Sequence, residues 1–158
     1  PAAIFSDEAA VKAAYADGKL DRDVVVVVCG QGPQANGMPE LHSLTPILSN
    51  LQDRGFAVAL VTDGRMSGAS GTVPAAIHVT PEAVAGGAIG RLQDGDMITL
   101  DAVVGRLETD ADLATRVAAG PSNMAPQRGF ARTLFQHMRD SAAPAEQGGG
   151  LPPRKDIS

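Results

Sequence analysis

A glycine-rich segment at 62–71 carries the residue types best suited to chemistry. Gly64, Gly68 and Gly71 allow backbone N–H groups to converge on one point, which is how many proteins bind an anion. Ser67 lies among them, and a serine hydroxyl acts as a base only when such donors or a metal stabilise its alkoxide. The same spacing also fits a tight turn that Ser67 merely caps, and spacing alone favours the turn.

Two charged residues add to this chemistry. Glu40 follows a glycine-rich loop at 30–37, and its carboxylate is a ligand of the kind that Mg²⁺ prefers. Its alternative is a solvated position in the first turn of the next helix, which is favoured when Glu40 is taken alone. Arg65 could grip a carboxylate or phosphate with two parallel hydrogen bonds, or it could pair with Asp63 or another acid.

The histidines and the cysteine give weaker signals. His42 could be a general acid or base, although polar surface is the commoner role, and His137 is interpreted as a helix-surface residue. His78 has apolar neighbours, which predicts a core histidine with satisfied ring nitrogens. Cys29 ends a valine-rich run, and nothing marks it as a reactive thiol. One cysteine cannot hold an iron–sulfur cluster or form an internal disulfide, and it suits a reducing cytoplasm.

The elements that position these residues follow from the apolar pattern. A β-branched run at 24–28 predicts a strand buried on both faces, and 57–61 predicts another. Between them Leu44, Ile47, Leu48 and Leu51 mark one helical face, with Ser43 as its cap. A strand–helix–strand unit has parallel strands, so both glycine-rich loops should open at the same edge of the sheet. Open α/β sheets bind ligands at that edge.

The rest of the chain is predicted more coarsely. Before the first strand, a helix is predicted at 7–17, with Ser6 as N-cap and Gly18 as its end. After the second glycine-rich loop, a short strand is predicted at 76–79, and the turn Asp94-Gly95 precedes a β-rich segment with strands at 97–100 and 103–109. The chain is then predicted to form a short helix within 110–118, a helix at 127–139 and a disordered tail from Ser141.

Composition bounds the function. A chain of 158 residues suits one domain, and 44% hydrophobic with 20% charged residues is ordinary for a globular protein. The net charge of −5, without a Lys/Arg cluster, argues against nucleic acid but allows an anionic small substrate. Neither a signal peptide nor an apolar run of ~20 residues is present, which predicts a cytoplasmic protein with no membrane partner.

Three runs in fixed order carry a family resemblance: GPQANGMPELH at 32–42, VTDGRMSGASG at 61–71 and VPAAIHVTPEA at 73–83. They continue through DGD at 94–96 to AEQG at 145–148. In this order they resemble the C-terminal part of the dihydroxyacid and phosphogluconate dehydratases, over nearly the whole chain. The parts at 35–42 and 67–71 are more similar to the phosphogluconate branch. The resemblance implies an α/β (mixed) fold: a swivelling β/β/α-type domain, a small β-barrel or sandwich flanked by helices, opening with a parallel βαβ unit.

The resemblance also implies a reaction, the dehydration of 6-phospho-D-gluconate to 2-dehydro-3-deoxy-6-phospho-D-gluconate in the Entner–Doudoroff pathway. It implies a 4Fe-4S or 2Fe-2S cluster as Lewis acid for the leaving 3-hydroxyl, together with Mg²⁺. Ser67 matches the base that removes the C2 proton, and Glu40 matches a carboxylate ligand of Mg²⁺. Arg65, Gly68 and Ser70 are the expected substrate-binding residues.

Several expectations concern the rest of the protein. Residues 1–140 are expected to form the C-terminal domain, and an N-terminal domain outside this chain is expected to hold the cluster ligands. That domain, the anionic sugar acid and a second copy in a homodimer are the expected partners. The chain alone should then be inactive and should expose an apolar interface patch.

Two alternatives stay open. A dehydratase of dihydroxyacids or of unphosphorylated sugar acids has the same chemistry, and phosphate recognition by Arg65, Arg128 or Arg132 would separate it from the phosphogluconate enzyme. A stand-alone anion-binding or interaction module would use the same loops without catalysis.

Overall fold

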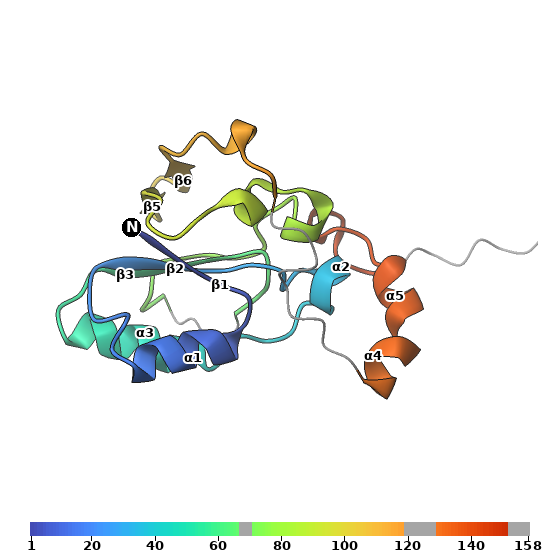
Figure 1. The fold of residues 1–158 in the computed structure, drawn as a ribbon, viewed down its shortest axis with the longest axis horizontal. Helices are drawn as coiled ribbons and strands as arrows, with labels where there is room; N and C mark the ends of the chain where they lie inside the picture. Colours follow the sequence, from blue (N-terminus) through green and yellow to red (C-terminus); the bar gives the residue numbers. More distant parts are fainter. Residues whose placement is uncertain (67–70, 119–128, 152–158) are drawn as a thin grey trace, which may run out of the picture.

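A parallel four-stranded sheet forms the centre of the computed structural model, which describes residues 1–66, 71–118 and 129–151 (Figure 1). Neighbouring strands are parallel throughout, and the register pairs Val24 with Val58 and Val28 with Thr62. This confirms the mixed α/β fold and its parallel opening unit. The strands, in sheet order, are β1 (Ala2–Phe5), β2 (Val24–Val28), β3 (Val58–Thr62) and β4 (Ala75–Ala76).

Helices α1 (Glu8–Ala16) and α3 (Leu44–Asp53) cover one face of the sheet (Figure 1). The N-cap of α1 is Asp7, whose side chain accepts the N–H of Ala10 at 2.8 Å, so the prediction of Ser6 was wrong by one residue. The helix begins at Glu8, and a cap must lie directly before the first helical residue. Ser43 does occupy the cap position of α3, but its side chain makes no capping hydrogen bond.

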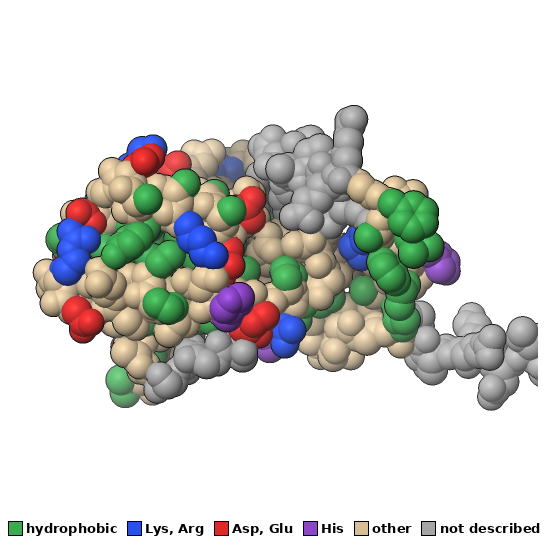
Figure 2. Space-filling model, turned by 90° about the horizontal axis from the view of Figure 1, so that it is seen from below, with side chains coloured by type: hydrophobic (Ala, Val, Ile, Leu, Met, Phe, Trp, Pro, Cys, Tyr) green, Lys and Arg blue, Asp and Glu red, His purple; other side chains and the backbone are tan. Residues whose placement is uncertain are grey.

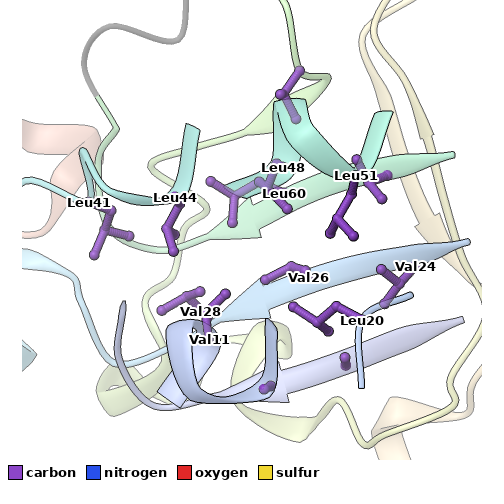
Figure 3. Close-up of a cluster of buried hydrophobic side chains, with 14 of the residues drawn as sticks. Val11, Leu20, Val24, Val26, Val28, Leu41, Leu44, Leu48, Leu51 and Leu60 are labelled. Carbon is purple, nitrogen blue, oxygen red and sulfur yellow. The ribbon is translucent and has the colours of Figure 1, made fainter. Parts of the chain in front are cut away.

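The main core lies between this face and the two helices (Figure 3). Val26, Val28 and Leu60 project from the strands, and each is fully buried. With few aromatic residues in the chain, the core is aliphatic, and each fully buried Leu or Val contributes about 1.5–3 kcal/mol relative to an exposed one. This packing fixes β2 and β3, whose ends carry the glycine-rich loops. Their helical partners are Val11, Leu44, Leu48 and Leu51.

The second half of the chain covers the opposite face of the sheet (Figure 1). Val27 and Val61 pack there against Ala83 and Ile89, so both central strands are buried on two sides, as their unbroken apolar runs predicted. The covering elements are the 3-10 helices η1 (Ala83–Ala85) and η2 (Ala88–Arg91), and the antiparallel hairpin of β5 (Ile98–Asp101) and β6 (Arg106–Thr109), which confirms the predicted pairing.

Three predicted elements differ in the structure. The strand expected at 76–79 is only β4, and the helix expected within 110–118 is only the 3-10 turn η3 (Leu113–Thr115), because Arg116 returns to extended backbone. The helix expected at 127–139 is divided at Phe135 into α4 (Phe130–Leu134) and α5 (Gln136–Asp140), and its first two residues lie outside the described ranges. A short helix, α2 (Pro33–Asn36), was not predicted.

Residues 141–151 have definite structure, although their composition predicted disorder. They include the 3-10 helix η5 (Ala145–Gln147), and the N–H of Ala143 donates to the Gly150 carbonyl at 2.9 Å. The side-chain amide of Gln34 donates to the Ala142 carbonyl at 3.1 Å. Gln34 and Ala142 lie far apart in sequence, so composition could not indicate their contact. Residues 152–158 of the predicted tail lie outside the described ranges.

No helix within the described ranges combines the length and apolar character needed to cross a bilayer.

Candidate functional site

The two glycine-rich loops meet at the carboxyl edge of the sheet, as the βαβ order predicted. Val28 and Thr62 are paired at the ends of β2 and β3, and the chain enters both loops directly afterwards. Further on, Glu40 and Arg65 form an isolated parallel bridge, and the N–H of Leu41 donates to the Arg65 carbonyl at 3.1 Å. The loops are therefore held together by backbone contacts.

Asp63 is the buried link between three segments at this edge. Its carboxylate accepts the N–H groups of Gly30 at 3.0 Å, Gln31 at 2.9 Å and Ala83 at 2.9 Å. The side chain is fully buried, and three backbone donors satisfy it. Sequence reasoning considered Asp63 only as a partner of Arg65. Its position directly after a strand buried on both faces is the sequence signal that could have identified Asp63 as a buried carboxylate.

Glu82 makes a second buried link to the first loop. It accepts the N–H groups of Gln34 at 3.0 Å and Ala35 at 2.9 Å, and its carboxylate lies so close to Gly32 that a Cβ there would overlap it. Burial raises the pKa of Glu82, an effect that the two N–H groups oppose and the charge of Asp63 reinforces. The hydrogen bonds of Glu82 thus anchor the segment that precedes Glu40.

Glu40 and Arg65, two of the predicted site residues, lie together. Arg65 Nη1 is 3.5 Å from Glu40 Oε2, and Arg65 Nε donates to the Met38 carbonyl at 2.8 Å. The partner acid of Arg65 is therefore Glu40, and Asp63 instead binds backbone N–H groups. Their side chains are 51% and 24% exposed, so the pair itself adds at most about 1 kcal/mol to stability. Glu40 also precedes α3 rather than lying in its first turn.

Several predicted residues fall outside what the structure describes. Ser67, Gly68 and Ser70 belong to the undescribed segment 67–70, and Arg128 to the segment 119–128. Arg132 belongs to α4, which lies about sixty residues after the second glycine-rich loop in sequence.

The sequence profile of the family described as dihydroxy-acid/6-phosphogluconate dehydratase, C-terminal, matches residues 1–149. The chain belongs to this dehydratase family. Both loops and both buried carboxylates lie within the matched residues.

Individual relatives show to which branch of the family the chain is more similar. The chain is 56% identical to the phosphogluconate dehydratase of Pseudomonas aeruginosa over 94% of its length, and 51% identical to that of Escherichia coli K12 over 94%. It is 39% identical to the dihydroxy-acid dehydratase of Solidesulfovibrio magneticus, again over 94%. The chain spans only about a quarter of the length of these curated relatives (25%, 25% and 26%).

All three histidines of the chain are exposed. His42 lies with Nε2 3.4 Å from the Ser43 hydroxyl, and His137 lies on the surface of α5. The prediction that His78 is a core histidine was wrong. The backbone of His78 has φ 56° and its N–H donates to the Gly64 carbonyl at 2.9 Å, so the strand ends before it. Its side chain is exposed beside the second loop instead of packing with its apolar neighbours.

Cys29 and the acidic groups limit which metal or cluster this chain can bind by itself. Cys29 is buried, and burial together with the charge of Asp63 raises its pKa to about 11, so the thiol stays neutral. This agrees with its interpretation as an unreactive strand-end residue. Across residues 1–66, 71–118 and 129–151, no three His, Cys, Asp or Glu side chains gather as a metal site. Glu40 can therefore offer one carboxylate to a metal whose other ligands come from elsewhere.

An apolar surface lies beside the first loop. Hydrophobic side chains gather over α4 and α5 (Figure 2), where Phe130 is 84% exposed and Leu134 is exposed as well. An open pocket of about 380 Å³ separates α5 from the loop, with Met38 on one wall and Met138 on the other. An apolar interface patch was expected from the sequence; these side chains are exposed, and that they form an interface stays a prediction.

Proposed function

We propose that this chain is the C-terminal part of a hydro-lyase that converts 6-phospho-D-gluconate to 2-dehydro-3-deoxy-6-phospho-D-gluconate and water, the Entner–Doudoroff step. The observation that carries the proposal is the difference in identity: 44–56% with relatives named phosphogluconate dehydratase, against 39% with the dihydroxy-acid dehydratase. The meeting of both glycine-rich loops at one sheet edge supports it.

In this proposal Ser67 takes the C2 proton, which is weakly acidic because it is α to a carboxylate. The electron pair of the C2–H bond forms the C2=C3 double bond as the C3–O bond breaks. The departing hydroxide takes up one proton, which balances the proton removed from C2, and leaves as water. The resulting enol tautomerises to the 2-keto acid. Gly68 and Ser70 are proposed to bind the substrate. Arg65 suits the anionic substrate because its guanidinium, held at Nε by the Met38 carbonyl, is half exposed at the same edge.

The proposed cofactors divide between this chain and the rest of the protein. Glu40 fits Mg²⁺ because it supplies a carboxylate oxygen at the edge where Arg65 lies, and it would be one ligand among several. When bound, Mg²⁺ would neutralise the substrate carboxylate and so make the C2 proton more acidic. Cys29 does not fit an iron–sulfur cluster, because it is buried with a raised pKa. We propose that the cluster ligands lie in the N-terminal domain of the full-length protein, which would correspond to the additional length of the relatives.

The proposed partners follow from the same division. The N-terminal domain of the full-length protein would complete the site, the full-length enzyme would be a cytoplasmic homodimer, and the chain alone would be inactive. The exposed apolar side chains of α4 and α5 support a covering partner.

Substrate selectivity of the full-length protein tests the proposal. We expect the anaerobically purified protein to form a 2-keto acid from 6-phosphogluconate with kcat/KM at least about a hundredfold above that for gluconate or a branched 2,3-dihydroxy acid, since one lost set of charged contacts to phosphate costs about 3 kcal/mol. Equal or higher kcat/KM for either competitor would assign the chain to that branch.

Binding by the isolated chain tests the remaining class, a stand-alone module. Calorimetry should detect no binding of 6-phosphogluconate in EDTA, because half a site provides too few contacts. Tight binding without metal, with Kd in the range of about 1 μM, would favour an anion-binding module.

A further inference from the structure

Two residues share an unusual backbone conformation beside the second glycine-rich loop. Met38 and His78, with φ 54° and 56°, are the non-glycine residues with positive φ within the described ranges. The Met38 carbonyl accepts from Arg65 Nε at 2.8 Å, and the His78 N–H donates to the Gly64 carbonyl at 2.9 Å. Both therefore hydrogen-bond to adjacent residues of the loop in which Arg65 lies.

The positive φ of His78 costs conformational free energy, and contacts of its side chain do not compensate for that cost within the described residues. A non-glycine residue at positive φ costs about 1 kcal/mol or more. The imidazole is exposed and makes no hydrogen bond or ion pair with any side chain or carbonyl in the described parts of the chain. Glycine or asparagine would make the same turn at less cost. Residues in sparsely populated backbone regions cluster at active sites and ligand-binding segments, so this conformation points to a functional role for His78.

The position of His78 indicates what that role is. The N–H of Val79 donates to the Thr62 carbonyl at 3.0 Å, so the backbone on both sides of the His78 side chain is fixed to the end of β3. β4, which precedes it, is parallel to β3, so His78 leaves the sheet at the same edge as Gly64 and Arg65. An exposed hydrogen-bond donor is thereby held at the edge where an anionic substrate is expected.

We propose that the imidazole of His78 contacts the substrate and donates a hydrogen bond to one of its oxygen atoms. A sugar acid offers carboxylate and hydroxyl oxygens as acceptors, and imidazole donates in its neutral and its protonated form. The assignment makes His78 a substrate-binding residue of the dehydratase and rests on the proposed function.

Two substitutions in the full-length protein separate the side chain from the backbone. His78→Gly removes the imidazole and relieves the positive φ, and His78→Asn keeps a donor in a residue that tolerates this φ. We expect His78→Gly to lower kcat/KM at least about tenfold, as one lost hydrogen bond to a charged group does, while the melting temperature stays the same or rises. His78→Asn should retain more activity, and added imidazole should restore part of the rate of His78→Gly but not change that of the wild type.

The control is His137→Ala, which removes an exposed histidine on α5 and should leave kcat/KM within about twofold. His78→Gly with near-wild-type kcat/KM would overturn the proposal, and so would a loss that neither imidazole nor His78→Asn restores. Each variant is compared on whichever acid the wild type turns over best. A wild type that prefers another hydroxy acid thus contradicts the proposed function while the test of His78 still stands.

Discussion

The backbone N–H of Ala83 donates to the buried carboxylate of Asp63 at 2.9 Å, across the end of the sheet. The same carboxylate accepts the N–H groups of Gly30 and Gln31, so one side chain fixes the start of each glycine-rich loop and the first residue of η1. The two loops at the candidate site are therefore positioned by an acid that does not itself face solvent.

Replacement of Asp63 should destabilise the fold. In Asp63→Asn the amide group of the side chain faces backbone N–H donors, so at least one of the three hydrogen bonds is lost in a buried setting. We expect the free energy of unfolding to fall by about 3 kcal/mol, measured by urea denaturation. Asp53→Asn, at the exposed end of α3, is the control and should change it by less than about 0.5 kcal/mol. Equal changes in both variants would show that the buried carboxylate of Asp63 contributes no more to the free energy of unfolding than an exposed one.

Glu40→Gln should act on metal use rather than on stability. The pair with Arg65 is partly exposed, so its loss costs at most about 1 kcal/mol in unfolding free energy. The Mg²⁺ concentration for half-maximal activity of the full-length enzyme should rise at least about tenfold, because an amide oxygen is a poorer ligand than a carboxylate. Glu108→Gln, in the exposed hairpin, should leave this concentration unchanged. Unaltered Mg²⁺ dependence in Glu40→Gln would rule out its role as a ligand.

Cys29 should resist alkylation in the native protein. Burial raises its pKa from 9.0 to about 11, so about one thiol in a thousand is ionised at pH 8. Iodoacetamide followed by peptide mapping should find the Cys29 fragment unmodified in the folded full-length protein and fully modified in urea. Rapid native labelling would contradict the raised pKa.

The same shift has a consequence for stability. Because the folded pKa is raised, the neutral thiol is the form that the fold favours, and its contribution is complete below pH 9 and lost as the pH rises toward about 11. The wild type should therefore lose stability relative to Cys29→Ala between pH 9 and 11, and a constant difference over that range would contradict this.

The sheet and the meeting of its two loops could be predicted because both leave local signals. The run Val24–Val28 matched β2 residue for residue, since burial on both faces demands unbroken apolar sequence. The shared edge of the two loops then followed from the parallel direction of the two strands in a βαβ unit.

His78 and Glu82 could not be predicted in the same way. The apolar neighbours of His78 suggested a buried strand, but its conformation is set by contacts with Gly64 and Thr62 of another segment. The burial of Glu82 likewise depends on the backbone of Gln34 and Ala35, nearly fifty residues earlier. Such long-range hydrogen bonds leave no periodic pattern in a single sequence.

Ser67→Ala in the full-length protein tests whether the second glycine-rich loop supplies the base of a sugar-acid dehydratase. The measurement is kcat for 2-keto acid formation from 6-phosphogluconate, with cluster absorbance and melting temperature recorded on the same anaerobic samples. We predict that kcat falls at least about a thousandfold, within the range expected for loss of an essential base, while absorbance and melting temperature match the wild type. A Ser67→Ala variant that keeps near-normal kcat would show that Ser67 is not the base.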